Sequence, residues 1–127
     1  MAGLRIQLLT NPEGILLLWP WLKEVPVVNI THAAVLARCL DGTYTIITAH
    51  KDDELCGFMA YYLQGEDLVV VALYLPNQTR EFLDEFMAWC RELKVKRFLA
   101  LSTQDSKTYS RLFGLTYLYG FFMREVI

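Results

Sequence analysis

Apolar residues follow two rhythms along this chain, one typical of strands and one typical of helices. Six segments are predicted to be strands, because their residues alternate between apolar and polar or are mostly β-branched, aromatic or apolar. In chain order these are residues 4–8, 43–50, 55–63, 68–75, 97–101 and 117–126. The unbroken run at 68–75 is typical of a central strand that is buried on both faces.

Helix start and stop signals lie between these strands. Asn11 and Pro12 favour the start of a first helix, and Pro20 is expected to break it. Thr31 is a suitable cap for a second helix over residues 32–40, which a following Asp-Gly pair ends. Two helices are therefore expected before the second strand.

A third helix follows the central strand, and a fourth is expected over residues 105–113. The third has one clearly apolar side, formed by Phe82, Leu83, Phe86, Met87, Cys90 and Leu93. The resulting order of elements predicts an α/β (α+β mixed) fold, with a central mixed, mostly antiparallel sheet and helices on both faces. The 127 residues are enough for one domain, which we expect to span residues 1–127.

Composition narrows the classes of protein and partner. Hydrophobic residues make up 54% and charged residues 20% of the chain, which excludes intrinsic disorder. The mean hydropathy of +0.27 is high for a small domain, so either the core is rich or apolar surface is buried against a partner. A net charge of −2 gives no electrostatic footprint for nucleic acid or for an anionic membrane. We therefore expect neither as a partner.

The cysteines and histidines do not form a metal pattern. Cys39, Cys56 and Cys90 are widely spaced among apolar residues, no C-x-x-C pair occurs, and the two histidines complete no zinc motif. Free thiols in a reducing compartment, with no metal, are expected. The apolar run 15–22 is too short to span a bilayer and lacks the features of a signal peptide. These features favour an intracellular location.

The second half of the chain resembles the GNAT (Gcn5-related N-acetyltransferase) superfamily. Residues 68–73 are similar to the fourth strand of that family, 82–90 to the helix that follows it, and 96–101 to the fifth strand. Residues 107–115 resemble the helix that ends in the family's gly-phe signature. The resemblance covers residues 43–126 and implies the GNAT fold.

Short GNAT-like proteins of tailed phages are the most similar in character. They often carry an aromatic residue five positions before the signature glycine, as Tyr109 stands before Gly114. This resemblance implies a phage-encoded protein, located in the host cytoplasm or in the virion.

The resemblance implies acetyl-CoA as the cofactor, but the phosphate-binding loop departs from the family pattern. Family members carry a glycine-rich turn after the fourth strand, whereas residues 76–81 contain no glycine. Gln78, Thr79 and Arg80 remain candidates for a phosphate contact, although helix capping is the favoured role for this segment. If the loop has lost its function, no cofactor is expected.

Backbone groups of the fourth and fifth strands bind the pantetheine arm in the family. The resemblance assigns this role to Val71, Ala72 and Leu73, whatever their side chains.

Catalytic side chains are harder to place. Tyr74 is the only ionisable residue of the central strand and so the candidate base there. Many family members carry a tyrosine four residues before the signature glycine as the acid for the departing thiolate. Here that position is Ser110, and Tyr109 lies one residue away, about 100° round a helix. Packing is therefore the favoured role for Tyr109.

Two apolar segments are candidate interfaces with a protein partner or a second copy of the chain. Residues 15–22 carry apolar groups on every side of a short helix, and residues 117–123 load both faces of the last strand, which in this fold usually lies near a sheet edge. The expected anchors are Trp19, Trp21, Tyr119 and Phe122.

These observations favour a non-catalytic GNAT-fold protein with a degenerate acetyl-CoA motif, acting through protein contacts as a phage virion or accessory component. The alternative is an active acetyl-CoA-dependent N-acetyltransferase that modifies a small amine or a lysine side chain. A third hypothesis is an inhibitor directed at a host protein.

Overall fold

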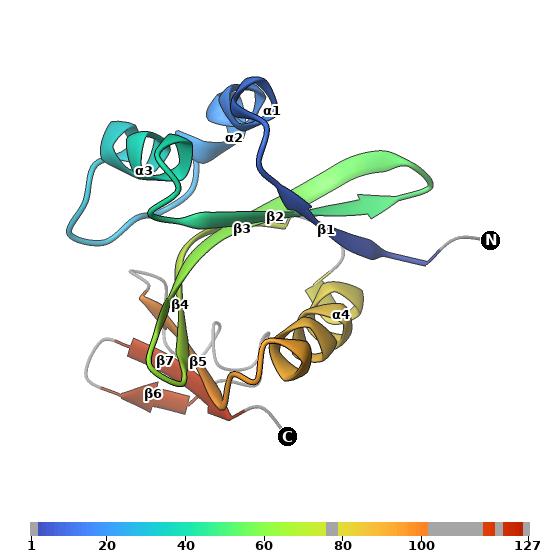
Figure 1. Cartoon of the computed structure of the whole chain (residues 1–127), viewed down its shortest axis with the longest axis vertical. Helices are drawn as coiled ribbons and strands as arrows, with labels where there is room; N and C mark the ends of the chain where they lie inside the picture. Colours follow the sequence, from blue (N-terminus) through green and yellow to red (C-terminus); the bar gives the residue numbers. More distant parts are fainter. Residues whose placement is uncertain (1–2, 76–78, 102–115, 119–120, 126–127) are drawn as a thin grey trace.

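A single mixed sheet runs through the molecule (Figure 1). The computed structural model describes residues 3–75, 79–101, 116–118 and 121–125, with side chains at 3–75 and 81–100. Seven strands in this part of the chain pair in the order β1-β2-β3-β4-β5-β7-β6. They are β1 (Arg5–Leu9), β2 (Thr45–Lys51), β3 (Glu54–Gln64), β4 (Asp67–Tyr74), β5 (Arg97–Leu101), β6 (Thr116–Leu118) and β7 (Phe121–Glu125). β4 and β5 are parallel and the other neighbours antiparallel, which confirms the mixed, mostly antiparallel sheet.

Helices cover both faces of this sheet, as expected (Figure 1). α1 (Pro12–Leu17), α2 (Trp19–Leu22) and α3 (His32–Leu40) lie on one face, and α4 (Thr79–Glu92) lies on the other. Both predicted caps are confirmed. The side chain of Asn11 accepts a hydrogen bond from the amide of Glu13 at 2.8 Å, and the hydroxyl of Thr31 accepts one from Ala34 at 3.1 Å.

The predicted first helix is in fact two short helices. α1 ends at Leu17, and α2 begins at Trp19 with Pro20 in its first turn. A proline is tolerated there because the first amides of a helix have no partner inside it. Pro20 therefore belongs to the start of α2 rather than marking the end of α1.

The C-terminal segment also differs from the prediction. Residues 117–126 were expected to form one strand, but β6 and β7 form an antiparallel pair in which Leu118 faces Phe121. Gly120 interrupts the apolar run in the sequence, and a glycine is a common turn signal that this prediction overlooked. β7 lies between β5 and β6, so the last strand lies one place in from the edge. The helix expected over 105–113 lies outside the described residues.

Two hydrophobic cores lie on either side of the sheet. The core beneath α4 includes Phe82, Phe86 and Cys90, each no more than 1% exposed, which confirms the predicted apolar side of that helix. Leu93 follows the helix and is exposed. The second core packs α1, α2 and α3 on the sheet around Val35. β4 contributes to both cores, as its unbroken apolar run predicted.

Gly57 in β3 allows the end of β4 to approach closely. A Cβ atom built there would lie 2.5 Å from the carbonyl oxygen of Tyr74 and 2.8 Å from a methyl carbon of Leu75. The nearer atom belongs to the backbone, so it cannot rotate away. The glycine is therefore required by the packing of two neighbouring strands.

Replacing Gly57 with alanine is expected to lower the free energy of unfolding by about 1–3 kcal/mol, because the two strands must separate to admit the methyl group. Urea denaturation of the two proteins measures the difference. Gly3→Ala is the matched control, since nothing lies within 4 Å of the added carbon at Gly3. Equal stability of the two variants would contradict the close approach of β3 and β4.

In the part of the chain that is described, no helix is long and apolar enough to cross a membrane.

Candidate functional site

β4 and β5 are paired over only part of their length. Their parallel ladder starts with Asp67 opposite Arg97 and ends with Val70 opposite Ala100, whereas β4 continues to Tyr74. Within the described residues, Val71–Tyr74 have no strand partner on the β5 side. We call this side of residues 71–74 the open edge of β4. It offers backbone amide and carbonyl groups to a ligand.

Charged side chains connect β4 and β5 where their parallel ladder begins, at Asp67 and Arg97. The guanidinium of Arg97 donates two hydrogen bonds to the carboxylate of Asp67, at 2.9 and 3.1 Å. The amide of Lys96 donates to the carbonyl of Glu66 at 2.9 Å, and their side chains form an ion pair. These contacts connect the two strands at the end of the ladder that lies away from the open edge.

A β-bulge lies where the open edge begins. Tyr61 pairs with Val70 and Ala60 pairs with Ala72, which leaves Val71 as the extra residue on β4. Val71 and Ala72 consequently both pack against the core beneath α1, α2 and α3, while Leu73 packs against the core beneath α4. The bulge therefore leaves Val71 and Ala72 both on the face that carries the cavity described next.

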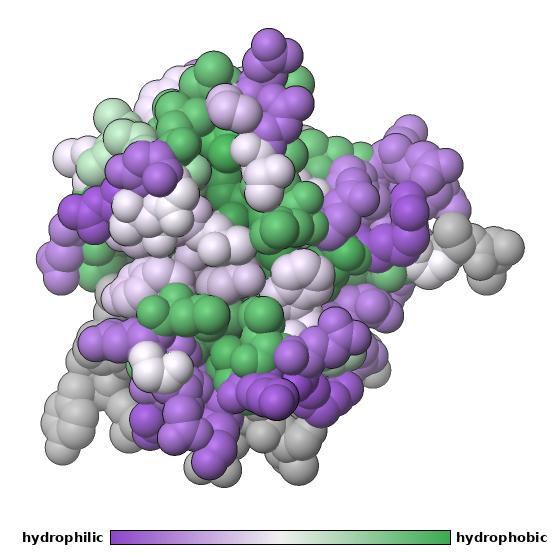
Figure 2. Space-filling model, in the orientation of Figure 1, coloured by the Kyte–Doolittle hydropathy of each residue, from purple (hydrophilic) through white to green (hydrophobic). Residues whose placement is uncertain are grey.

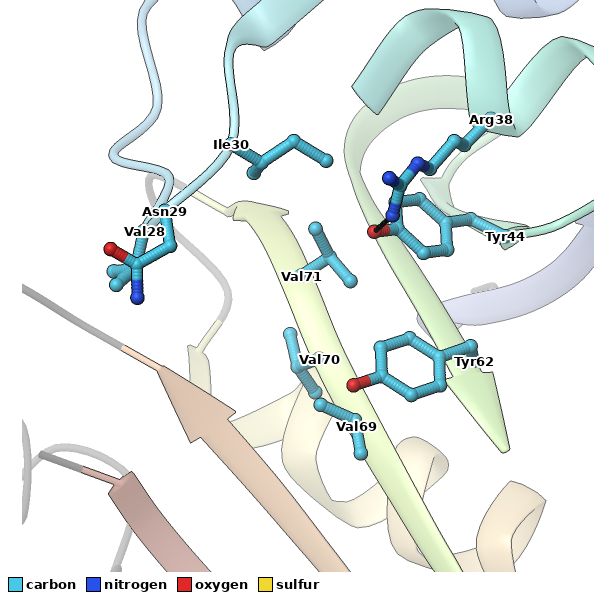
Figure 3. A pocket seen from close by; sticks show the side chains of 9 residues that line it. All are labelled: Val28, Asn29, Ile30, Arg38, Tyr44, Tyr62, Val69, Val70 and Val71. Atoms are coloured by element: carbon cyan, nitrogen blue, oxygen red, sulfur yellow. Dashed lines mark hydrogen bonds between the residues drawn. The ribbon is translucent and has the colours of Figure 1, made fainter. Parts of the chain in front are cut away.

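A cavity of about 180 Å³ lies on this face, beside the bulge (Figure 3). Its walls come from the loop between α2 and α3, from α3, from the start of β2, and from β3 and β4. The lining residues are Val28, Asn29, Ile30, Arg38, Tyr44, Tyr62, Val69, Val70 and Val71. We call it the Arg38 pocket. His32 fixes the loop that covers it, because its Nε2 lies 2.7 Å from the carbonyl oxygen of Val25.

The polar wall of the Arg38 pocket is built from Arg38 and two tyrosines. Nη1 of Arg38 donates to the hydroxyl of Tyr44 at 3.0 Å, and the guanidinium carbon lies 5.6 Å from the centre of that ring. The rings of Tyr44 and Tyr62 stack with centroids 5.7 Å apart. In Figure 3 the guanidinium meets the Tyr44 hydroxyl beside the cavity, and Val71 points toward them. Arg38 forms no ion pair with a carboxylate of the described residues.

Tyr74, the candidate base from the sequence, lies at the end of β4 in an aromatic stack. Its ring centroid is 4.6 Å from that of Trp21 and 6.2 Å from that of Phe58. It does not line the Arg38 pocket. Of the residues expected to bind the cofactor, Val71 lines the pocket and Ala72 is buried. A cofactor role for Val71, Ala72 and Leu73 stays a prediction.

The expected anchors Trp19 and Trp21 are partly buried and pack against the core beneath α1, α2 and α3. The exposed apolar groups of this segment are instead Leu16 and Leu17, which are 51% and 78% exposed. Figure 2 shows hydrophobic residues gathered at the top of the molecule, over α1 and α2. An interface role for Trp19 and Trp21 stays a prediction. Leu16 and Leu17 were not among the anchors expected from the sequence, and both lie in the six-residue helix α1.

The start of α4 lies close to an ion pair. Nζ of Lys51 lies 2.9 Å from Oε1 of Glu81, and this hydrogen bond raises the pKa of Lys51. The carboxylate of Glu81 alone would repel a phosphate, and Lys51 balances its charge. Thr79 and Arg80 form the first turn of α4. Their side chains, and the whole of Gln78, lie outside the described residues.

Four of the residues predicted to act in catalysis or at an interface lie in the C-terminal part of the chain. Tyr109, Ser110 and Tyr119 lie outside the described residues. Phe122 lies in β7, where its backbone pairs with Ala100 on one side and with the neighbouring strand β6 on the other. Its role as an interface anchor stays a prediction.

His50 is a titratable residue on β2, next to the edge strand β1. Its Nε2 is 2.9 Å from Nε2 of Gln7 and 2.8 Å from the hydroxyl of Thr48. Partial burial, and then the charge of Arg5, lower the pKa of His50. It does not line the Arg38 pocket.

The three cysteines are poor nucleophiles. Burial raises the pKa of Cys39 to about 11 and that of Cys90 to about 12, and it also raises the pKa of Cys56. A thiolate is therefore scarce at neutral pH. No group of three or more residues suited to a metal ion occurs in the described part of the chain.

Comparison with known proteins identifies the fold. No family model and no curated protein matches the sequence. The ribosomal-protein-S18-alanine N-acetyltransferase of Escherichia coli is similar, with a TM-score of 0.73, 8% identity, and coverage of 97% of this chain and 94% of that one. An acetyltransferase of the GNAT family from Staphylococcus aureus gives a TM-score of 0.63 at 10% identity, with 98% and 100% covered.

A third similar structure was solved with ligands. The N-acetylglutamate synthase of Neisseria gonorrhoeae, complexed with coenzyme A and N-acetyl-glutamate, gives a TM-score of 0.67 at 13% identity. The match covers the whole of this chain and 36% of that one. At these identities the likeness establishes the GNAT fold, and the activity has to be argued from the site.

Proposed function

We propose that this protein is an acetyl-CoA-dependent N-acetyltransferase that acts on a small amine. The observation that carries the proposal is the open edge of β4, with the bulge at Val71, directly beside the Arg38 pocket. Two ligands that must react have to lie next to each other. The open edge offers backbone groups to a thioester, and the pocket offers a partly open space to an acceptor.

The reaction requires few side chains. The acceptor amine first loses a proton to water, and its nitrogen then forms a bond to the acetyl carbon. The bond between that carbon and sulfur breaks, and the sulfur leaves with the second proton of the nitrogen as free CoA thiol. The protein contributes chiefly the positioning of the amine against the thioester, and backbone amides that stabilise the developing negative charge on the thioester oxygen.

The start of α4 supports binding of the CoA diphosphate. The first amides of a fourteen-residue helix have no partner within it and favour an anion. Lys51 balances the negative charge of Glu81 at this position. The missing glycines in residues 76–81, which favoured a non-catalytic protein, are therefore opposed by a charge arrangement that the sequence did not reveal.

Titration calorimetry with acetyl-CoA and with CoA tests the proposal. Micromolar binding of both is expected. Glu81→Gln should tighten CoA binding about 3- to 10-fold because it removes a charge that repels phosphate, and Lys51→Gln should weaken it by a similar factor. Lys23→Gln, which removes a positive charge on the other side of the sheet, should leave it unchanged. Absence of binding at millimolar CoA would refute the proposal.

A second function, assembly through protein contacts without catalysis, is favoured by the exposed Leu16 and Leu17. It predicts no CoA binding, together with self-association or partner binding that Leu17→Ser abolishes. Sedimentation velocity of the two proteins measures the self-association. A role within a phage particle stays a prediction from the sequence resemblance.

A further inference from the structure

The Arg38 pocket has one charged lining residue within the described part of the chain. Four of its lining residues are valines and one is isoleucine, and the remaining polar groups are an asparagine amide and two tyrosine hydroxyls. Arg38 uses one of its five N–H groups on Tyr44 and none on a described carboxylate. Hydrogen bonds from Thr43, and then the charge of Arg38, lower the pKa of Asp41, but Arg38 and Asp41 form no ion pair. The pocket therefore presents a guanidinium without a direct ion pair to a described carboxylate, beside an apolar floor.

Arg38 is an exposed residue of α3, and Tyr44 positions its guanidinium. Nη1 donates to the hydroxyl oxygen of Tyr44, and Cζ lies over the ring of the same residue. The stacked ring of Tyr62 supports Tyr44 from the side of β3. Because Tyr44 accepts the hydrogen bond from Arg38, its own hydroxyl proton is available for the same ligand. A guanidinium and a neighbouring hydroxyl together match a carboxylate.

The size of the pocket restricts the ligand. A volume of about 180 Å³ is smaller than the roughly 300–1,000 Å³ of pockets that hold drug-sized ligands. The apolar floor formed by Val69 and Val71, with Ile30 opposite, suits a short aliphatic group (Figure 3). A small molecule with one carboxylate and one aliphatic branch fits both features.

The lining of the Arg38 pocket also influences the protonation state of a bound amine. No carboxylate lines the pocket in the described residues, so nothing there stabilises an ammonium group. An amine close to Val71 would meet valine side chains and backbone, and desolvation favours its neutral form. The neutral amine is the nucleophile that acetyl transfer needs.

We propose that the Arg38 pocket binds a small aliphatic α-amino acid as the acetyl acceptor. Its carboxylate lies on Arg38 and the hydroxyl of Tyr44, its side chain lies on the valine floor, and its amine faces the open edge of β4. This assignment rests on the proposed acetyltransferase function. The amine nitrogen gains the acetyl carbon and gives up one proton to water and one to the departing sulfur.

The test is direct binding, measured by titration calorimetry without acetyl-CoA. The probes are alanine, valine and leucine, each compared with the amine of the same skeleton that lacks the carboxylate (ethylamine, isobutylamine and isoamylamine). At least one amino acid should bind more tightly than its amine. Arg38→Gln should weaken this binding about 10- to 100-fold, and Arg38→Lys should restore part of it, because lysine keeps the charge and loses the fork.

Two controls separate this inference from the proposed function. Arg5→Gln removes an exposed positive charge outside the pocket and should leave amino-acid binding unchanged. CoA binding, measured on the same Arg38→Gln protein, should also be unchanged. If CoA binds but the amines bind as tightly as the amino acids, or Arg38→Gln has no effect, the carboxylate assignment is wrong and the acetyltransferase function stands. If the amino acids depend on Arg38 while CoA does not bind, the role of the pocket as an acceptor site fails together with that function.

Discussion

Replacing Phe86 with alanine is expected to lower the free energy of unfolding by about 3–5 kcal/mol, which corresponds to a fall in Tm of roughly 10–20 °C. Phe86 is 1% exposed and lies at the centre of the core beneath α4. Its ring stacks on Phe82 at 5.7 Å and meets the edge of Phe98, on β5, at 5.2 Å. The substitution removes the ring that joins α4 to the sheet, and the remaining large side chains cannot fill the cavity.

Thermal and urea denaturation of both proteins measure the loss. Leu17→Ala is the control, because Leu17 is 78% exposed and its truncation should change the stability by less than about 0.5 kcal/mol. If Phe86→Ala leaves too little folded protein, Phe86→Leu keeps the apolar contact and should give an intermediate loss. Equal stability of Phe86→Ala and Leu17→Ala would mean that α4 does not pack on the sheet as described.

Local patterns in the sequence were sufficient to predict this part of the fold. The apolar side of α4 repeats with the helical period, and β4 contains the longest unbroken apolar run among the predicted strands. The caps Asn11 and Thr31 also act within three residues of their own position. Such features depend on near neighbours along the chain, so a single sequence is enough to reveal them.

The candidate site could not be predicted in the same way. The bulge at Val71 is a shift of register between β3 and β4, and the open edge is defined by where the pairing with β5 stops. Neither feature requires a particular side chain. The Arg38 pocket joins segments that are up to 43 residues apart, from Val28 to Val71. Sequence reasoning considered neither Arg38 nor Tyr44, because neither belongs to a motif. The only trace of the pocket in the sequence is that Arg38 stands six residues before Tyr44, which lies near the start of a predicted strand.

The sequence also could not predict the ion pair at the start of α4. The sequence places Lys51 and Glu81 thirty residues apart, and only the sheet brings β2 and the first turn of α4 together. A motif search finds missing glycines, but it cannot find a cation that the fold supplies from another strand. The loss of a motif is therefore weaker grounds for loss of function than the sequence suggested.

Replacing Val71 with phenylalanine is expected to weaken acceptor binding at least 100-fold. Val71 is the bulged residue and its side chain lines the Arg38 pocket, so an added ring occupies much of a volume of about 180 Å³. The backbone of the open edge is left in place, and CoA binding should change by less than about threefold. Calorimetric titration with CoA, and with whichever of leucine and isoamylamine binds the unaltered protein better, measures the two effects separately.

Two further variants test whether the effect on acceptor binding depends on the volume of the side chain at position 71. Val71→Ala enlarges the pocket and should shift the preference toward acceptors with longer side chains, which is the opposite change from that of phenylalanine. Leu63→Phe adds a ring at an exposed position on β3 that does not line the pocket, and it should leave both ligands unaffected. If Val71→Phe binds the acceptor as well as Leu63→Phe does, the acceptor does not occupy the Arg38 pocket. If it weakens CoA and acceptor equally, the two ligands do not occupy separate sides of β4.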